Sequence, residues 1–362
     1  MKFVKLVLVK ILEQKTSLAA IAAACEVTTM TVSRALRQDG RVLESTRRRI
    51  VTMADKMGYL PANKRAGRPR RASTTVRKSI DVIWGMAVAP ENIFQSQLLI
   101  AIEQTLARRG CDCVIRTCGH DYDRFLRLCE TLRDSSAAAT LLVGDFQVEQ
   151  LRTLIRLLPK SILVDQTDDP RLDGPYEFVA FDNVEAARLA TRHLIQTGRR
   201  RIVLLTGPKD HCFSREIERG YRDVLESSDI AWDAKRIHYT NFSAHSAHAL
   251  ICQMIEKGAD FDAVFTNDEM ATGVLRALHE KGKRVPEDVA VIGCDGLPLG
   301  LQTIPSLTTV ALDYDQLGRL AVESVLSDAG EKTAPQRLRL VPRLVVREST
   351  GGGVLPEQAP QR

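Results

Sequence analysis

Beyond Ile80 the chain alternates short apolar runs with amphipathic segments of helical period, and this alternation limits the possible folds more than any other feature. A parallel sheet covered by helices produces such a pattern, because its strands are buried on both faces. Strands are expected at residues 80–84, 113–116, 139–143, 161–164, 178–181, 201–205, 263–266 and 289–293. The pattern therefore predicts an α/β fold with two doubly wound lobes that divide near Phe181.

The same pattern gives the boundaries of a large body at residues 80–350. Helices are expected at 97–109, 184–197, 215–227, 244–257 and 270–281, followed by a β-like segment at 306–312 and a helix at 317–326. We assign residues of about 80–181 and 311–345 to a first lobe and about 182–310 to a second. The tail, 351–362, is rich in glycine and proline and is predicted to be disordered.

Charge is distributed unevenly along the 362 residues. Residues 1–79 contain 18 Lys and Arg but 5 Asp and Glu, whereas the remainder contains 33 basic and 40 acidic residues. A basic head on a slightly acidic body indicates a module that binds a polyanion, either nucleic acid or an anionic membrane surface. Because no apolar run is long enough to span a membrane and no cleavage site follows residues 1–15, we expect a cytoplasmic protein. Residues 1–15 are then either a helical N-terminal extension or a consequence of the choice of start site.

Three short helices are expected within residues 16–60. They cover 18–25, 28–36 and 45–57, and the second begins at a threonine that suits a helix N-cap. A tight turn joins the first two helices. This arrangement predicts a helix-turn-helix DNA-binding domain.

The second helix of such a domain enters the major groove with its N-terminal residues toward the base edges. The residues in this position are Thr28, Thr29, Met30, Thr31, Ser33 and Arg34. Arg34 can donate two hydrogen bonds to a guanine, while Arg47, Arg48 and Arg49 in the third helix suit phosphates. Considered alone, the pattern fits an ordinary solvated helix equally well.

The order of residues in this region resembles the lactose-repressor (LacI/GalR) family of transcriptional regulators, and is most similar to gluconate-operon repressors. The likeness rests on Ile21-Ala22, Val27-Thr28, Met30-Thr31-Val32-Ser33-Arg34-Ala35-Leu36, Thr46-Arg47, Gly58-Tyr59-Leu60-Pro61 and Asn63. The resemblance implies a repressor whose affinity for operator DNA is controlled by a small molecule. It also implies a homodimer or tetramer that binds double-stranded DNA at a palindromic site.

Residues 61–79 are predicted to be a basic hinge, with seven Lys and Arg and no acidic residue. In the family that the chain resembles, a short hinge helix presents a leucine to the minor groove, and the register places Arg68 at that position. The surrounding Gly-Arg-Pro resembles an AT-hook core, which lays arginine in a narrow A·T-rich minor groove. A flexible linker that touches phosphates is the alternative. Asn63, Arg65 and Arg68 are the candidate DNA contacts here. A further departure is Leu43, where the family usually has a serine that caps the third helix.

The body resembles the family's periplasmic-binding-protein-like domain over nearly all of residues 80–345. The resemblance implies that a small effector binds between the lobes at the ends of the strands, where open α/β sheets place ligands in general. Matching position by position gives the candidate effector-binding residues Asn92, Phe94, Asp165, Arg215, Phe242, Asn267 and Asp295. A sugar or sugar acid requires polar side chains for its hydroxyls and an aromatic ring to cover one face.

Some of these positions have a second interpretation as helix N-caps. We favour a cap for Asp182 and Asp268, and a ligand contact for Asn267. Ile217 occupies the position of the family's ligand-clamping arginine, for which Arg215 or Arg219 is the nearest replacement. A neutral hexose therefore does not follow from the resemblance, and a non-sugar effector remains an alternative.

The sequence contains no nucleophile elbow, phosphate loop or set of metal ligands, so we expect neither enzyme activity nor a cofactor or metal. Cys111, Cys113 and Cys118 lack the second pair of ligands that a zinc site requires, and His245 and His248 lack a third ligand. An architectural DNA-binding protein with an AT-hook-like hinge is the remaining alternative, but it gives the two-lobed body no purpose.

Overall fold

The protein was examined as a computed structural model, which describes residues 18–36, 42–57, 78–85, 92–119, 121–166, 171–172, 175–327 and 335–352. The predicted N-terminal extension, nearly all of the predicted hinge and most of the predicted tail lie outside these ranges. The chain divides into two compact units between Thr75 and Val76. Of the described helices, none is long and apolar enough to cross a membrane.

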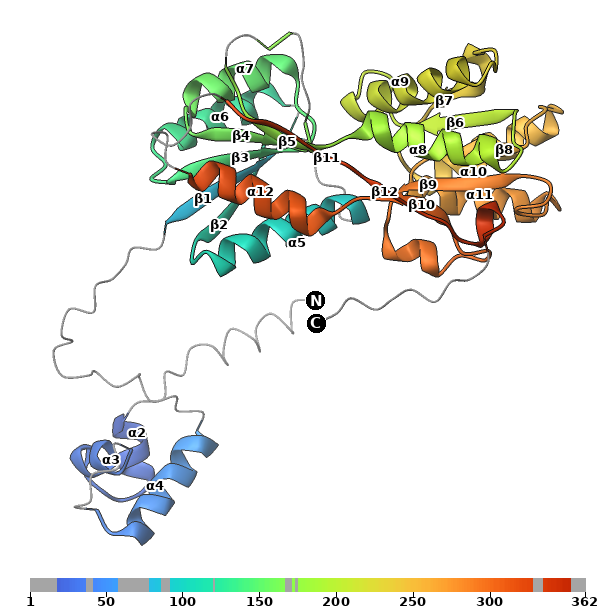
Figure 1. Cartoon of the computed structure of the whole chain (residues 1–362). Coiled ribbons are helices and arrows are strands. Elements are labelled where there is room, and N and C mark those ends of the chain that lie inside the picture. Colours follow the sequence, from blue (N-terminus) through green and yellow to red (C-terminus); the bar gives the residue numbers. More distant parts are fainter. Residues whose placement is uncertain are drawn as a thin grey trace. The chain divides into compact units, whose positions relative to one another are not determined.

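The first unit contains the three predicted helices, each within one residue of its expected bounds. They are α2 (Leu18–Ala24), α3 (Thr29–Leu36) and α4 (Glu44–Lys56) (Figure 1). Their shared core is formed by Ile21, Val32 and Ile50, which are all fully buried. This small core fixes which face of α3 remains exposed.

The second unit begins with a sheet of six parallel strands in the order β11-β5-β4-β3-β1-β2. The strands are β1 (Ser79–Trp84), β2 (Asp112–Thr117), β3 (Ala139–Val143), β4 (Ser161–Val164), β5 (Phe178–Phe181) and β11 (Arg337–Leu340). The helices α5 (Ile93–Arg108) and α12 (Tyr314–Leu326) cover one face, and α6 (Tyr122–Arg133) and α7 (Val148–Leu157) cover the other (Figure 1).

A second sheet has the order β12-β10-β9-β8-β6-β7, in which only β12 is antiparallel. The strands are β6 (Ile202–Thr206), β7 (Ile237–Tyr239), β8 (Ala263–Phe265), β9 (Ala290–Asp295), β10 (Thr308–Ala311) and β12 (Arg343–Val345). The helices α8 (Asn183–Gln196) and α9 (Cys212–Ser227) cover one face, and α10 (Ala244–Glu256) and α11 (Asp268–Glu280) cover the other. The predicted α/β fold with two doubly wound lobes is confirmed.

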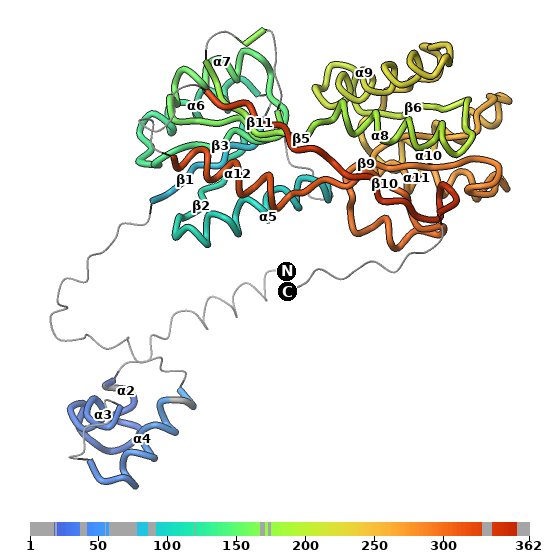
Figure 2. The backbone as a smooth tube through the Cα atoms, viewed as in Figure 1, coloured from blue at the N-terminus to red at the C-terminus, as the bar shows by residue number. Residues whose placement is uncertain are grey.

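The chain crosses between the lobes three times: after β5, after β10, and between β11 and β12. Figure 2 shows the last crossing as the red segment that runs from one lobe to the other. The prediction that 311–345 belongs to the first lobe is wrong at both ends. Ala311 pairs with Asp295, and Arg343–Val345 pairs with β10, so both segments belong to the second sheet. The strands β11 and β12 are short and contain arginine, so the sequence pattern did not indicate that the chain returns to the second sheet at β12.

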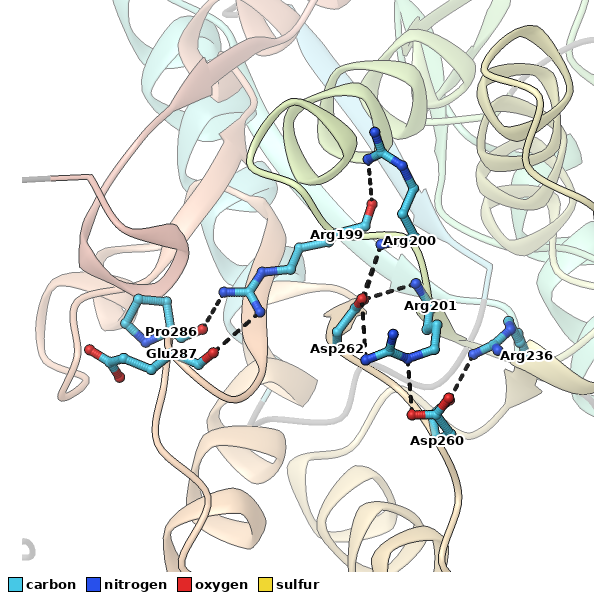
Figure 3. A network of polar contacts seen from close by, with 8 residues as sticks. All are labelled: Arg199, Arg200, Arg201, Arg236, Asp260, Asp262, Pro286 and Glu287. Atoms are coloured by element: carbon cyan, nitrogen blue, oxygen red, sulfur yellow. Dashed lines mark hydrogen bonds and ion pairs between the residues drawn. The ribbon is translucent and has the colours of Figure 1, made fainter.

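Three consecutive arginines precede β6, and polar contacts within the second lobe hold all of them (Figure 3). The buried carboxylate of Asp262 accepts hydrogen bonds from the backbone N–H groups of Arg200 and Arg201. The guanidinium of Arg199 donates to the carbonyl oxygen of Pro286 at 2.5 Å. These contacts join the amino ends of β6 and β8, so this basic cluster has a structural role.

Candidate effector cavity and DNA-reading helix

A cavity of about 760 Å³ lies between the two lobes of the second unit, at the carboxyl ends of their parallel strands. Its walls include all seven side chains that were predicted to bind an effector: Asn92, Phe94, Asp165, Arg215, Phe242, Asn267 and Asp295. These residues come from widely separated parts of the sequence. The fold therefore brings together one set of polar and aromatic groups, as a small-molecule site requires.

Strained backbone is concentrated in this cavity. Asp165 (φ 58°), Phe242 (φ 64°) and Asp295 (φ 125°) adopt positive φ angles, which L-residues rarely do. Only two other non-glycine residues, Glu26 and Asp229, share this feature among the residues that the structure describes. Such strain persists where the surroundings impose it, and it is common at ligand-binding sites.

Phe242 forms the centre of an aromatic wall in the second lobe. Its ring centroid lies 5.0 Å from that of His211 and 5.8 Å from that of Phe213, in edge-to-face geometry. Gly207 makes this position possible, because a Cβ atom at residue 207 would lie 1.9 Å from Cζ of Phe242. The ring therefore occupies space that only glycine leaves open.

Two predicted ligand contacts also cap helices. Oδ1 of Asn92 accepts the backbone N–H of Gln95 at the start of α5, and Oδ1 of Asn267 accepts that of Met270 at the start of α11. Asn267 is thus a helix cap, which was the less favoured of its two interpretations. The side chain of Asn267 also lines the cavity. Asp182 caps α8 as predicted, through the N–H of Glu185.

The prediction that Asp268 caps a helix is wrong. Its buried carboxylate accepts hydrogen bonds from the hydroxyl of Thr309 and the backbone N–H of Leu297, both at 2.6 Å. It therefore holds β10 and the turn after β9 against the start of α11. Burial raises the pKa of Asp268 to about 6, while these hydrogen bonds oppose the shift.

The cavity contains carboxylates from both lobes. Asp165 follows β4 in the first lobe, and Asp295 ends β9 in the second and is 3% exposed. Burial, together with the negative charges of Glu216 and Asp145, raises the pKa of Asp165 to about 8. Burial likewise raises the pKa of Asp295, together with the charges of Asp268 and Asp165. Both groups are therefore poised to lose a proton when a ligand compensates their charge.

Two contacts between the lobes were not predicted. Nε2 of His211 lies 3.8 Å from Oδ2 of Asp145, and Nη1 of Arg339 donates to Glu216 at 2.9 Å. Glu216 also accepts a hydrogen bond from Asn183, which lines the cavity. Asp145 was detectable in principle, since it lies two residues beyond a predicted strand. No local signal in the sequence pairs either acid with its partner in the other lobe.

Arg215 lines the cavity but is exposed, and its guanidinium donates to the carbonyl oxygen of Asp210. Ile217 is 1% exposed and packs in the core beneath α9. An apolar side chain at residue 217 thus becomes part of the core and does not line the cavity.

In the first unit, α3 presents most of the predicted base-reading residues to solvent. Thr29, Met30 and Arg34 are exposed, with Met30 at 61%, while Val32 and Ala35 face the core. Thr28 is exposed as well, and its hydroxyl accepts the backbone N–H of Thr31. The predicted threonine N-cap is therefore confirmed.

The predicted phosphate contacts on α4 differ from one another. Arg47 and Arg48 form ion pairs with Glu44 at 3.4 and 3.6 Å, and Arg48 is largely exposed. Arg49 instead donates to the carbonyl oxygen of Cys25 at 3.1 Å and so joins α4 to the end of α2. Leu43, just before α4, is 78% exposed and has no side-chain group that could cap the helix. Asn63, Arg65 and Arg68 lie outside the described residues.

The structure supplies partners for one of the two histidines on α10. His248, Cys252 and Glu280 have possible metal-ligating atoms within 4.8 Å of one another, which corrects the expectation that His248 lacks further ligands nearby. The imidazole already forms a 2.7 Å ion pair or hydrogen bond with Glu280, which also pairs with Arg276. Cys111, Cys113 and Cys118 form no such group among the described residues.

Comparisons with known proteins agree with this architecture. Residues 17–62 match the bacterial regulatory proteins of the lacI family, and residues 191–350 match a periplasmic binding protein-like domain. The transcriptional regulator CelR of Thermobifida fusca is 30% identical over 93% of this chain and 98% of its own length. The ribose operon repressor of Halalkalibacterium halodurans is 26% identical over 95% of this chain and 100% of its own length.

A solved structure gives the same result. The complex of the regulator CelR with cellobiose aligns with a TM-score of 0.67 at 28% identity, over 92% of this chain and all of the other. Since CelR of Thermobifida fusca matches the DNA-binding unit and the two-lobed unit together, the likeness extends to the whole regulator and is not confined to a shared ligand-binding fold. The chain belongs to the LacI family of bacterial regulatory proteins and is a DNA-binding transcriptional regulator, not an enzyme.

Proposed function

We propose that this regulator is a cytoplasmic homodimeric repressor that reads a palindromic operator with α3 and binds a sugar or sugar acid in the cavity between its lobes. The observation that supports the proposal is that one cavity is lined by all seven side chains that the family resemblance predicts to bind an effector. Their chemistry suits a polyhydroxylated ligand, with the ring of Phe242 to cover one face and amide and carboxyl groups for the hydroxyls.

For DNA, the exposed face of α3 carries Arg34 and Met30, which suit a guanine edge and a thymine methyl group. Two copies of such a helix, related by a two-fold axis, match two half-sites of an inverted repeat. Arg48 is positioned for phosphate contact near the start of α4. The basic segment around Arg68 is proposed to contact the minor groove, as the AT-hook-like sequence suggests.

Control of DNA binding is proposed to operate through closure of the lobes. A ligand held by groups of both lobes favours the closed arrangement by its difference in affinity for the two states. The three crossings between the lobes provide the hinge, and two of them contribute Asn183 and Leu312 to the cavity wall. A change in lobe angle then alters the distance between the two DNA-binding units of the dimer.

Two measurements on the full-length protein test this proposal. Selection of bound fragments from a random DNA library is expected to return an inverted repeat, and a thermal-shift screen of sugars and sugar acids is expected to give a stabilising compound. That compound should then change operator affinity. Recovery of sequences without a repeat, together with a stabilising compound that leaves DNA binding unchanged, would contradict the proposal.

A further inference from the structure

Two acidic side chains of the cavity, Asp165 and Asp295, have no basic partner among the described residues, in contrast to Glu216 beside them. Among the described residues, Glu216 forms an ion pair with Arg339 and Asp145 lies 3.8 Å from the imidazole of His211, but no ion pair includes Asp165 or Asp295. Asp165 and Asp295 belong to opposite lobes, and each raises the energy of the other's ionised form. The cavity therefore presents two carboxyl groups, Asp165 and Asp295, that no basic side chain of the described residues neutralises.

The arginines of the cavity are held away from this acidic centre. Arg152 donates to the carbonyl oxygen of Arg171 at 3.0 Å, and Arg215 donates to that of Asp210. Arg171 and Arg215 are exposed, whereas Asp295 is buried. The cavity thus has carboxyl groups in its interior, while both signs of charge occur at its exposed rim, where Arg171 and Arg215 lie together with Glu149 and Asp210.

Residue 217 adds no positive charge to the cavity. Residue 217 is isoleucine in this chain, and its side chain is buried in the core beneath α9. The preceding residue, Glu216, adds a negative charge that acts on Asp165. A ligand carboxylate placed near Asp165 would meet like charges from both lobes, and the aromatic wall around Phe242 would not compensate them.

We infer that the effector carries a positively charged nitrogen, as an amino sugar or another polyhydroxylated amine does, and that this nitrogen lies against the carboxylate of Asp165. The inference rests on the proposed function, since it assumes that the cavity holds the effector, and it excludes the sugar-acid branch of that proposal. An ammonium group supplies both the missing charge and several hydrogen-bond donors to carboxylates of the two lobes. Phe242 adds a ring face that attracts cations.

Proton release gives the inference a distinctive signature. The titratable groups around Asp165 are the carboxyl groups of Asp145, Glu216 and Asp295, the phenol of Tyr314, the thiol of Cys212, and the imidazole of His211 near Asp145. With a pKa of about 8, Asp165 holds its proton at pH 7 in the empty cavity. An ammonium ligand displaces that proton, so about one proton is released for each ligand bound.

Isothermal titration of the full-length protein tests this at pH 7 in two buffers of different ionisation enthalpy. The panel contains glucosamine, galactosamine and mannosamine, each with its parent hexose and its N-acetylated form, together with gluconate, N-methylglucamine and putrescine. At least one amine is expected to bind tenfold or more tightly than its uncharged counterpart, with proton release. Failure of every amine to bind, or tighter binding of the uncharged counterparts, would overturn the inference.

Asp165→Asn keeps the shape of the side chain but removes its charge. This variant is expected to lose most of the preference for the amine and the proton release, whereas Asp123→Asn, which changes an exposed aspartate on α6 outside the cavity, should keep both. An unchanged preference in Asp165→Asn would overturn the inference. If a neutral sugar or gluconate binds instead and alters operator affinity, the proposed function stands without the amine; if no cavity ligand alters operator affinity, the proposed function itself fails.

Discussion

Asp145 and His211 face each other across the cavity, with 3.8 Å between the carboxylate Oδ2 and the imidazole Nε2. Asp145 follows β3 in the first lobe, and His211 caps α9 in the second through its Nδ1, which accepts the N–H of Phe213. Burial lowers the pKa of His211, Asp145 opposes this shift, and Arg215 contributes to it. The neutral imidazole is therefore the form that joins the two lobes at pH 7.

Substitution of this histidine separates its two roles. His211→Asn keeps a side-chain oxygen to cap α9 but is too short to face Asp145, so the closed arrangement loses one contact. Effector affinity is expected to fall by about three- to tenfold, in the range of one lost polar contact. Calorimetric titration measures this effect, and Asp145→Asn should reproduce it. Full affinity in both variants would show that the contact has no part in closure.

Asp165 is expected to make stability depend on pH. The folded protein keeps its proton up to about pH 8, whereas an unfolded aspartate loses it near pH 4. Between these values the folded state binds more protons, so stability decreases as pH rises. The melting temperature of Asp165→Asn should therefore rise relative to that of the parent protein between pH 4 and pH 8. At pH 8 the difference should reach a few degrees. If the melting temperatures of the two proteins differ by the same amount at pH 4 and pH 8, the raised pKa of Asp165 is contradicted.

Arg34 and Arg48 are expected to contribute to DNA binding in different ways. Arg34→Ala should weaken binding to the selected operator by about 1–3 kcal/mol and relax the preference at one base pair. Arg48→Ala should weaken binding to all sequences alike and reduce its salt dependence, because it removes a phosphate contact. Fluorescence anisotropy with matched and mutated operators distinguishes the two. Unaltered sequence preference in Arg34→Ala would rule out its role as a base-reading residue.

Gly207 is predicted to be necessary for the aromatic wall. In Gly207→Ala the new methyl group would overlap the ring of Phe242, which must move from its position beside His211. Effector binding should fall at least tenfold while operator binding persists. Gly300→Ala is a suitable control, since its nearest neighbour is the end of the flexible Arg347 side chain at 3.2 Å. Normal effector binding in Gly207→Ala would show that the ring position is unimportant.

Much of the fold was predictable because buried strands leave continuous apolar runs. The expected strands at 139–143, 161–164 and 178–181 agree with the structure at both ends. The edge strands β7, β11 and β12 were missed, since they are three or four residues long, contain arginine, histidine or tyrosine, and lack the continuous apolar run of a buried strand. The wrong lobe boundary at 343–345 follows directly from that omission.

The cavity was predictable only as a set of positions. The ends of the expected strands identified Asp165, Asn267 and Asp295 as candidate ligand contacts. They did not indicate the direction in which each side chain points. Adjacent residues such as Asn267 and Asp268 offer the same helix-capping chemistry, and only tertiary contacts decide which of them caps α11. Contacts between lobes, such as Glu216 with Arg339, depend on the closing geometry and have no local signature.

The central claim is that a ligand in the cavity controls operator binding. The most direct test compares operator affinity of the full-length protein with and without a stabilising compound, in the parent protein and in Asp295→Ala. A change of tenfold or more is expected in the parent protein and less than twofold in the variant, which should still bind operator without ligand. An equal change in both proteins, or none in the parent protein, would contradict the claim.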